Sequence, residues 1–478
     1  MTCTSTRVVV IGAGVAGLAT THYLLHGDPS VEHPLDVTLV EASERAGGKV
    51  VTRRRDGFVV EGGPDCFLTQ KPWAVDLCRH LGLESRLIGT NEASRKVLIP
   101  WGGKMHQLPD GVLLIVPTRF APFAFSPLIS PLGKLRMGLD LVLPARRDSG
   151  DESVASFVRR RLGGEALDKI AEPLMGGIHV SDPERQSILA TFPRFRDIER
   201  KHGSLVRGML AARRARPAKS GKELPMFMTL RGGLGELVDA LSQSAAGARC
   251  LFGQRALAVQ PTEAGAYRVV LDDGGVLRAD QVVLAVPARV AAELVRGFAG
   301  ELSARLRSLR YVSTATVSLG YRRSSLSRPL DGFGFVVPTK EGRRITGCTW
   351  SSTKFDDRAP DGHVLVRCFL GGAVDETPAL LPEDEMVALA REELRDLMGL
   401  KAEPVLSEVF SWRQAHPQYD VGHLRWLAEV EALAAQLPGL HLVGSSYRGV
   451  GLPDCIRSGK AAAGLVLSAT MAEEVVGR

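Results

Sequence analysis

Two glycine-rich segments, one near each end of the chain, have the residue types and spacing of an anion-binding turn. In the first, VVVIGAGVAGLA, Gly12, Gly14 and Gly17 follow an apolar, β-branched run. The first glycine of this pattern allows a tight turn, the second lets backbone N–H groups approach a pyrophosphate, and the third lets a helix pack closely on the strand. That helix also points the positive end of its dipole at the anion. We therefore predict a dinucleotide site over residues 12–17.

An acidic residue follows the next predicted strand. The run DVTLV, residues 36–40, is strand-like and ends directly before Glu41. A carboxylate at this strand end can accept hydrogen bonds from ribose hydroxyls. The link between helix and strand, residues 26–36, is longer than is usual for this motif. The preceding strand, the following helix and the acid together predict a nucleotide site.

The residues after this acid favour one nucleotide. The run EASERAGGKV supplies Arg45 and the pair Gly47 and Gly48, and EGGPDCF adds a second glycine turn at residues 61–67. A basic side chain beside a phosphate and bare backbone beside a flat ring suit FAD. Lys49 stands where arginine is more usual, so a two-pronged contact there becomes a point charge. The alternative is that these glycines only turn a hairpin.

The C-terminal one of the two glycine-rich segments is LHLVGSSYRGVGLPDCIRSGKAAA, residues 440–463. It has the same order of strand, glycine turn and helix, and Pro453 suits the first turn of that helix. The helix dipole there would stabilise negative charge on a reduced flavin. Two such turns at opposite ends of the chain predict one long cofactor held at full length, which favours FAD over an exchanging nicotinamide.

Composition narrows the function further. The chain has 478 residues, enough for two or three domains, with 45% hydrophobic and 24% charged residues and a net charge of +7. The basic residues are scattered without aromatic interleaving, so we predict no nucleic-acid binding but an anionic substrate or an acidic membrane surface. Seven cysteines without a C-x-x-C pair and eleven histidines without ligand spacing predict reduced thiols and no metal site.

The segment from Pro109 to Pro144 is rich in Leu, Ile, Phe and Pro and poor in acids. One interpretation is a buried helical subdomain. The other is a monotopic patch on a membrane surface, with basic residues at the headgroups. No apolar run is long enough for a transmembrane helix, and we expect no signal peptide, because the predicted nucleotide-binding strand begins only a few residues into the sequence.

Strands dominate from Leu309 to Leu370, followed by a helix at residues 384–398 and a predicted loop at residues 410–423. A strand at residues 281–286 returns the chain to the nucleotide-binding sheet. These patterns indicate an α/β protein in which a mixed or antiparallel sheet forms the wall of a pocket.

The chain resembles the oxygen-dependent porphyrinogen oxidases, a family within the monoamine-oxidase-like flavoproteins. The resemblance covers nearly the whole length, and its motifs are EASERAGGKV, EGGPDCFL, EPLMGGIHVSD, KHGSLVRGM, GFGFVVP, GCTWSSTKF, HPQYDVGHL and GVGLPDCIRSGKAA. The glycine triplet and E-x-x-x-R-x-G-G are shared with amine oxidases and carotenoid desaturases. HPQYDVGHL together with GVGLPDCI is specific to the porphyrinogen oxidases.

The resemblance implies an FAD-binding Rossmann-like domain of the glutathione-reductase and amine-oxidase type, formed by residues 1–95, 205–297 and 440–478. It also implies an inserted mixed-sheet substrate domain (96–108, 181–204 and 298–439) and a helical, membrane-associated region (109–180). The implied contacts with FAD are Gly12, Ala13, Gly14, Val15, Ala16, Gly17, Glu41, Ala42, Arg45, Gly48, Lys49, Gly63, Pro64, Asp65, Cys66, Trp412, Gly449, Val450, Gly451 and Leu452.

The implied reaction removes six electrons from a porphyrinogen in three two-electron steps, after each of which oxygen reoxidises the flavin and yields hydrogen peroxide. The cofactor carries the chemistry, so we expect no conventional catalytic acid–base pair. Phe333 and Val336 would press on the macrocycle, and Gly177 would let a backbone carbonyl approach the pyrrole N–H groups. His179 stands where relatives often carry tyrosine.

Basic residues near the pocket mouth would meet the propionates of the substrate. We predict Lys71, Arg95 and Lys96 for this role. Coproporphyrinogen III has four carboxylates and protoporphyrinogen IX has two, so an extra cation at Lys71 favours the former. The resemblance also lies nearer to the Gram-positive, coproporphyrinogen-using branch.

The main hypothesis is therefore FAD-dependent oxidation of coproporphyrinogen III to coproporphyrin III in haem synthesis, and the first alternative is oxidation of protoporphyrinogen IX. An amine oxidase and a non-catalytic binding or escort module on the same fold are more remote. The expected partners are the porphyrinogen, molecular oxygen, a peripheral membrane surface and the next enzyme of the haem pathway, to which product would be handed over. The expected location is the cytoplasm, with contact at the inner face of the cell membrane.

Overall fold

A five-stranded parallel sheet lies at one end of the computed structural model, which describes residues 5–27, 35–109, 112–113, 116–117, 120–214 and 224–477. Its strand order is β12–β2–β1–β16–β22, and neighbouring strands are parallel. The strands are β1 (Thr6–Ile11), β2 (Leu35–Glu41), β12 (Arg249–Phe252), β16 (Gln281–Leu284) and β22 (Leu440–Leu442). The predicted strands at residues 36–40 and 281–286 are both confirmed as members of this sheet.

Both faces of the parallel sheet are covered, which explains the unbroken apolar run in β1. Val8 and Val10 pack against helices on one face, whereas Val9 and Ile11 pack against the opposite layer. The first layer contains α1 (Val15–His26), α2 (Trp73–His80), α11 (Gly235–Ser244) and α17 (Leu452–Gly477). The second contains β13 (Ala256–Pro261), β14 (Tyr267–Leu271), β15 (Val276–Ala279), α12 (Ala288–Val295), α13 (Gly300–Arg307) and α16 (His423–Ala434).

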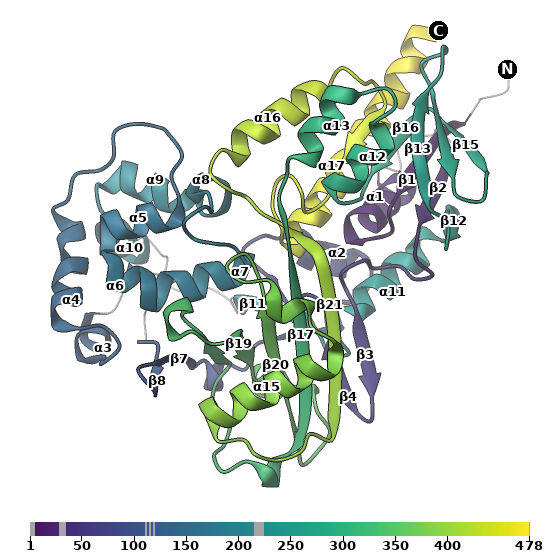
Figure 1. Cartoon of the computed structure of the whole chain (residues 1–478). Helices are drawn as coiled ribbons and strands as arrows, with labels where there is room; N and C mark the ends of the chain where they lie inside the picture. Colours follow the sequence, from purple (N-terminus) through teal and green to yellow (C-terminus); the bar gives the residue numbers. More distant parts are fainter. Residues whose placement is uncertain are drawn as a thin grey trace.

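The first and last helices of the described chain pack directly on each other. Figure 1 shows α17, in yellow, beside α1, in purple. The contact is close because Gly459 of α17 lies against the backbone of α1, where a Cβ atom would approach the Ala16 carbonyl oxygen to 2.6 Å. The two ends of the chain therefore form one layer of the same domain.

A seven-stranded mixed sheet forms the middle of the molecule, with the order β21–β17–β20–β19–β18–β7–β8. Only the pairing of β18 with β7 is parallel. The strands are β7 (Val97–Trp101), β8 (Lys104–Gln107), β17 (Tyr311–Arg322), β18 (Gly334–Val336), β19 (Ile345–Thr349), β20 (His363–Gly371) and β21 (Leu406–Pro417). Helix α15 (Glu383–Met398) packs against this sheet and confirms the helix predicted at residues 384–398.

The loop predicted at residues 410–423 is wrong over its first half. Residues 406–417 form the edge strand β21. Every second side chain at its start, Leu406, Glu408 and Phe410, is buried, and those between them are more exposed. The polar residues that suggested a loop lie on the strand's exposed side and beyond a register shift opposite Val312 and Thr314. Gln414, next to that shift, has a positive φ of 44°, so the extended conformation of the strand is interrupted there.

Small sheets and turns connect the two large sheets. They are β3 (Thr52–Arg55) with β4 (Phe58–Glu61), and β5 (Phe67–Leu68), β11 (Phe227–Leu230) and β6 (Leu87–Gly89) in a three-stranded sheet. A further pair is β9 (Val112–Leu113) with β10 (Val116–Pro117), and α14 (Ser351–Lys354) lies between β19 and β20.

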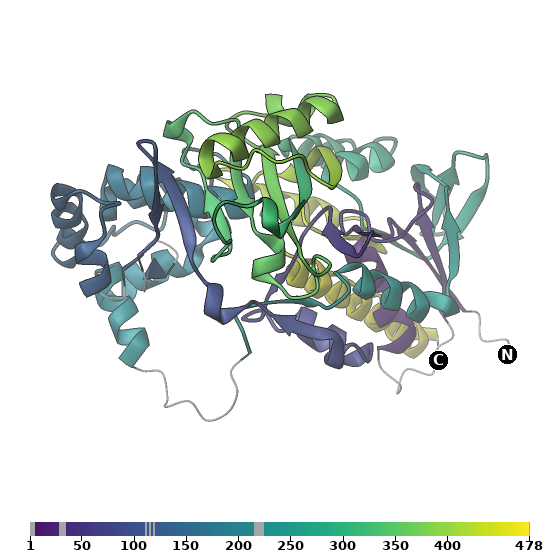
Figure 2. The ribbon, with the colours of Figure 1, turned by 90° about the horizontal axis from the view of Figure 1, so that it is seen from below.

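A helical region lies at the end of the molecule opposite to the parallel sheet (Figures 1 and 2). Its core joins Phe123, Met137, Phe157, Phe195 and Met209, so residues 181–214 pack with the helices that precede them. The helices are α3 (Phe120–Phe125), α4 (Pro131–Gly138), α5 (Val154–Leu162), α6 (Gly164–Ala166), the π-helical segment η4 (Leu167–Gly176), α7 (Gly177–His179), α8 (Ile188–Thr191), α9 (Pro193–His202) and α10 (Leu205–Arg214).

The apolar segment predicted at residues 109–144 has two kinds of face where the structure describes it; residues 110–111, 114–115 and 118–119 lie outside the description. Leu128 and Ile129 are buried in the helical core, whereas Phe125 and Leu132 are 88% and 79% exposed. The buried-subdomain interpretation therefore holds for the inner face. None of the helices in the described ranges combines the length and apolar character needed to cross a bilayer.

Candidate functional site

The first glycine turn lies between β1 and α1, as predicted. Gly12 has a φ of 104°, and a Cβ atom at Gly17 would come within 1.9 Å of the Gly12 carbonyl oxygen, so both positions need glycine. No described side chain caps the start of α1, and no described atom lies within 4 Å of the position of a Cβ at Gly14. Free N–H groups at a helix start, facing open space, fit the phosphates of a dinucleotide.

Glu41 lies at the same turn. Its Oε2 accepts a hydrogen bond from the Ala13 N–H at 2.7 Å, and its Oε1 accepts one from the Ser43 N–H at 2.9 Å. The carboxylate is thus held at the end of β2 next to the glycine turn, with Ala42 exposed beside it. Its contact with a ribose stays a prediction that this position supports.

Arg45 shapes the loop that follows. Its Nη2 donates to the Gly48 carbonyl at 2.7 Å and its Nη1 donates to the Ala46 carbonyl at 3.0 Å. The Gly47 N–H in turn donates to the Ala13 carbonyl at 2.8 Å, which ties this loop to the first glycine turn. The guanidinium therefore holds the loop's shape, and its contact with a phosphate stays a prediction.

Lys49 joins three distant parts of the chain. Its Nζ donates to the Ala415 carbonyl at 2.8 Å and to the Ser445 hydroxyl at 3.3 Å. Burial lowers the pKa of Lys49. Burial and the nearby Lys49 ammonium lower the pKa of His416 to about 3, so that imidazole is neutral. The loop after Glu41, the end of β21 and the C-terminal glycine segment therefore meet at Lys49.

The second glycine turn, residues 62–66, is held from the seven-stranded sheet. Trp412 Nε1 donates to the Gly62 carbonyl at 2.8 Å. Lys354 Nζ contacts the Asp65 carboxylate at 2.8 Å and the Cys66 sulfur at 3.6 Å. Burial alone would raise the pKa of Asp65, but the nearby Lys354 and Arg367 cations hold it below its usual range. The Asp65 side chain is therefore paired with the protein, while Gly63 and Pro64 supply the turn.

The C-terminal glycine segment closes the site. The Gly449 N–H donates to the Tyr419 hydroxyl oxygen at 2.9 Å, and that hydroxyl donates to the Ser445 carbonyl at 2.8 Å. Val450 and Gly451 are half-buried, and α17 begins at Leu452. The tyrosine of the HPQYD motif thus fixes the shape of the C-terminal turn.

The residues predicted to contact a macrocycle lie where the helical region meets the seven-stranded sheet. Val336 ends β18 and packs against the helical core, and Phe333, just before β18, is half-buried. Gly177 begins α7 and is exposed, with no described atom near the position of a Cβ. Glu172 of η4 accepts hydrogen bonds from the Thr339 N–H at 3.0 Å and hydroxyl at 2.7 Å, which ties the two regions together.

The three basic residues predicted at the pocket mouth all have acidic partners. Lys71 Nζ lies 2.5 Å from Asp454 in the first turn of α17. Arg95 pairs with Glu92 at 2.9 Å, and Lys96 pairs with Asp331 at 2.5 Å. The Lys96 carbonyl accepts from the Phe333 N–H at 2.7 Å, so Lys96 and Phe333 are neighbours. Lys71 instead lies near α7, where burial of His179 and, to a smaller extent, the Lys71 charge lower the pKa of His179 to about 4.

Sequence reasoning missed the side chains that hold the second glycine turn from a distance. Arg367 on β20 and Lys354 at the end of α14 lie about 300 residues from that turn, at separations of 304 and 289 positions. Both fall in or near strand motifs whose local pattern indicates only sheet formation. Among the described residues, no three His, Cys, Asp or Glu side chains gather closely enough to hold a metal ion.

Comparison with known proteins agrees with this geometry. The family model of flavin containing amine oxidoreductases matches residues 15–467. A coproporphyrinogen III oxidase from Bacillus subtilis is 37% identical over 95% of this chain and 97% of its own, and one from Propionibacterium freudenreichii is 36% identical over 98% and 92%. A crystal structure from Exiguobacterium that carries the name protoporphyrinogen oxidase superposes with a TM-score of 0.85, at 31% identity over 98% of this chain and 99% of that one.

These matches span nearly the whole chain, and they agree with the converging glycine turns described above. The predicted amine-oxidase type of fold is confirmed. The chain belongs to the family of flavin-containing amine oxidoreductases.

Proposed function

We propose that this protein oxidises a porphyrinogen, with coproporphyrinogen III as its preferred substrate, and uses oxygen as the acceptor. The observation that carries the proposal is the 37% identity to a coproporphyrinogen III oxidase over almost the full length of both chains. The relative named protoporphyrinogen oxidase is less similar, at 31%. The alternative substrate is protoporphyrinogen IX.

The cofactor of this family is a flavin, here FAD, and the residues of the site fit it. The open, uncapped start of α1 suits the pyrophosphate, and the Glu41 carboxylate lies beside it for a ribose. The turn at Gly63 and Pro64 and the segment Gly449–Leu452 would flank the other end. When bound, FAD supplies two-electron oxidation, and its reoxidation by oxygen yields hydrogen peroxide.

The protein's own part is to bind, orient and keep water out. Lys49 and Tyr419 fix the two loops that would enclose the cofactor. Phe333 and Val336 would orient the macrocycle between the seven-stranded sheet and α7, and Gly177 would leave room for close backbone approach. We expect no conventional acid–base pair among these residues, because the cofactor carries the redox chemistry.

Substrate choice would depend on how readily a propionate displaces the acidic partners of Lys71, Arg95 and Lys96. Because Asp454 neutralises Lys71 at 2.5 Å, Lys71 can favour a four-carboxylate substrate only if a propionate displaces that partner. Lys96 is the better candidate, since it lies next to Phe333 and its partner Asp331 is 62% exposed. Arg95 directly precedes Lys96 and would add a second positive charge for a propionate.

Parallel steady-state kinetics on coproporphyrinogen III and protoporphyrinogen IX test the proposal. A yellow protein with a higher kcat/KM for coproporphyrinogen III and peroxide release is expected. A preference for protoporphyrinogen IX would establish the alternative, and peroxide release with amines alone would make the protein an amine oxidase. A colourless protein that binds porphyrin without turnover would be a binding module. Unchanged turnover in Phe333→Ala would reject the proposal that Phe333 orients the macrocycle.

The proposed domains follow the packing. We assign the parallel sheet and its helices to cofactor binding and the seven-stranded sheet to substrate binding. Residues 181–214, expected partly in each of those two domains, pack with the helical region, which supports a boundary near residue 214. Within that region Phe125, Leu132, Leu135 and Val142 are exposed, near Lys134 and Arg136.

This exposed apolar face supports peripheral contact with a membrane, from which the macrocycle could enter and leave and product could pass to the next enzyme of the haem pathway. Sedimentation with vesicles that contain anionic lipid tests the contact. Wild-type protein is expected in the pellet, and Leu132→Ser with Leu135→Ser is expected in the supernatant. Equal sedimentation of both, or of neither, would remove the membrane proposal.

A further inference from the structure

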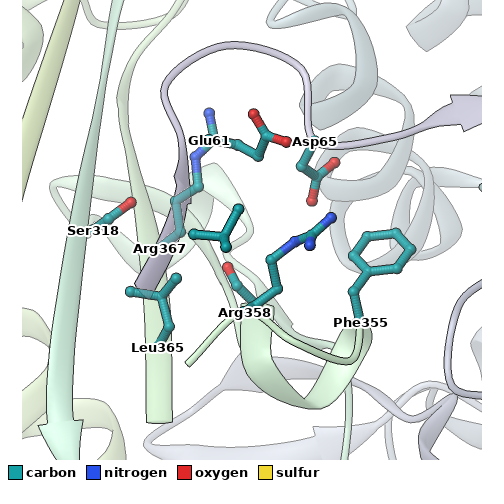
Figure 3. A pocket seen from close by; sticks show the side chains of 9 residues that line it. Glu61, Asp65, Ser318, Phe355, Arg358, Leu365 and Arg367 are labelled. Carbon is teal, nitrogen blue, oxygen red and sulfur yellow. The ribbon is translucent and has the colours of Figure 1, made fainter. Parts of the chain in front are cut away.

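A small buried chamber lies directly behind the second glycine turn (Figure 3). The carboxylates of Glu61 and Asp65 and the guanidinium groups of Arg358 and Arg367 are directed into it, with Ser318 on another wall. Its free volume is about 10 Å³. Of these five residues, only Asp65 belongs to the set predicted to contact the cofactor, so the chamber needs its own explanation.

Arg367 connects the seven-stranded sheet with the second glycine turn. It lies in β20 and is 4% exposed. Its Nη2 donates to the Gly63 carbonyl at 2.6 Å and to the Gly62 carbonyl at 3.2 Å. Thr316 of β17 and Trp412 of β21 also donate to the Gly62 carbonyl, at 3.2 Å and 2.8 Å. Three adjacent strands therefore hold two consecutive carbonyls of a turn that is distant in sequence.

The Arg367 guanidinium donates to backbone carbonyls and forms no direct ion pair with a carboxylate among the described residues. The nearest carboxylates, Glu61 and Asp65, make no ion pair with it within 4 Å among the described contacts, and Asp65 is taken by Lys354 at 2.8 Å. Burying a guanidinium without a direct counter-charge is unfavourable, so such a residue needs a specific task. Both carbonyls are held by one nitrogen, Nη2, whose N–H directions are fixed by the planar guanidinium, whereas the N–H groups of a lysine ammonium rotate.

Two polar atoms on the chamber wall have no hydrogen-bond partner among the described residues. They are Arg367 Nε and Ser318 Oγ, and both are buried. Buried polar groups in native proteins almost always have partners, and a space of this size admits one water molecule. A water in the chamber could accept from Arg367 Nε and bond with the Ser318 hydroxyl.

We propose that Arg367 is a positioning residue for the flavin: its Nη2 fixes the carbonyls of Gly62 and Gly63, and one bound water completes the hydrogen bonds of its Nε. The inference rests on the proposed placement of FAD against this turn. A turn that is no longer fixed would present its backbone to the cofactor in several conformations, which weakens binding and alters the environment of the flavin ring.

The test is Arg367→Lys, with Arg358→Lys as a matched control. Arg358 lines the same chamber, but it donates to the carbonyls of Arg231 and Leu230 and not to the glycine turn. We expect Arg367→Lys to raise the FAD dissociation constant about tenfold, the effect of about one charge-assisted hydrogen bond, and to shift the visible flavin absorption band. Arg358→Lys should leave both close to wild type.

Wild-type binding and absorption in Arg367→Lys, or equal changes in Arg358→Lys, would overturn the positioning role. If Arg367→Lys fails to fold, Thr316→Val removes a bond to the same carbonyl without removing a charge. It should weaken FAD binding by about twofold to fivefold, and an unchanged constant would also count against the proposal. Wild-type protein that binds no FAD would instead refute the cofactor site itself. A crystal structure of the holoenzyme with an empty chamber would refute the bound water.

Discussion

The helical region and the chamber behind the second glycine turn both bury arginine, but they use it differently. In the helical region Arg161 is fully buried and paired with Asp140, at 2.6 Å from its Nε. Its other nitrogens donate to the carbonyls of Leu143, Pro144 and Gly203, and Asp140 also accepts from the Ser204 hydroxyl. In the chamber, the Arg367 guanidinium donates to carbonyls of the second glycine turn, and its buried Nε has no partner among the described residues.

This difference separates two purposes of a buried charge. The Arg161–Asp140 pair satisfies itself and joins η3 (Leu139–Leu141), α5 and the start of α10, so its effect is on stability. Arg367 ties the second glycine turn to the seven-stranded sheet, so under our proposal its effect should be on cofactor binding. Substitutions can therefore separate stability from function, and the following predictions run from the largest expected effect to the smallest.

Asp140→Ala should cause the largest loss of stability. It removes the nearer carboxylate of the fully buried Arg161 and leaves Glu199 at 3.6 Å from its Nη1; breaking a close buried pair in this way typically costs about 3–5 kcal/mol. The measurement is the free energy of unfolding in urea, followed by circular dichroism. Asp140→Asn is the control, because it keeps the shape and part of the hydrogen bonding and should lose less. A loss below about 1 kcal/mol in Asp140→Ala would mean that the pair does not anchor the helices.

Glu61 should make stability depend on pH in an unusual direction. Burial raises the pKa of Glu61 to about 7, although Thr52 and the Leu234 N–H donate to its carboxylate. Because the folded state keeps the proton above the unfolded pKa of about 4.5, this contribution is complete below pH 4.5 and is lost as pH rises toward 7. Glu61→Gln should remove that slope, worth about 1–3 kcal/mol, in urea unfolding at pH 5 and pH 7. An identical slope in the variant would contradict the assignment.

His179, on the helical side of the site, should act in the opposite direction. Burial lowers the pKa of His179 to about 4. Below pH 6.5 the unfolded chain therefore binds a proton at this imidazole, whereas the folded chain stays unprotonated there until about pH 4. Its contribution is present above pH 6.5 and is lost as pH falls toward 4. In His179→Tyr the loss of stability on acidification should be smaller by about 1 kcal/mol, measured as the change in Tm between pH 7 and pH 5. Equal changes in variant and wild type would show that the imidazole is not buried in solution.

Lys96→Gln should change stability least. Its pair with Asp331 is exposed on both sides, and such pairs contribute less than about 1 kcal/mol. The effect should appear instead as a higher KM for coproporphyrinogen III. The control for the loss of a positive charge elsewhere is Arg323→Gln, because Arg323 is exposed and directly follows β17. An unchanged KM would remove Lys96 from substrate binding.

The sequence pattern predicts the parts of the site that are local in the chain. A short stretch of sequence is enough to predict the strands and helices that carry these parts. They are the turns at Gly12–Gly17 and Gly449–Leu452 and the acid at Glu41. The edge strand β21 escaped prediction because its polar residues and the irregularity at Gln414 disguise it as a loop. Arg367 and the pairing of Lys71 with Asp454 depend on contacts across hundreds of residues, for which a single sequence carries no periodic signal.

The hydrogen bonds of Lys49 to Ala415 and Ser445 have a consequence for biosynthesis. A ribosome delivers the N-terminal turn early, but the edge strand β22 and helix α17 emerge last. Until then the nascent domain has an unfinished sheet and an open cofactor cradle. Coenzyme loading should therefore follow the synthesis of α17, and chains truncated before residue 440 should remain apoprotein.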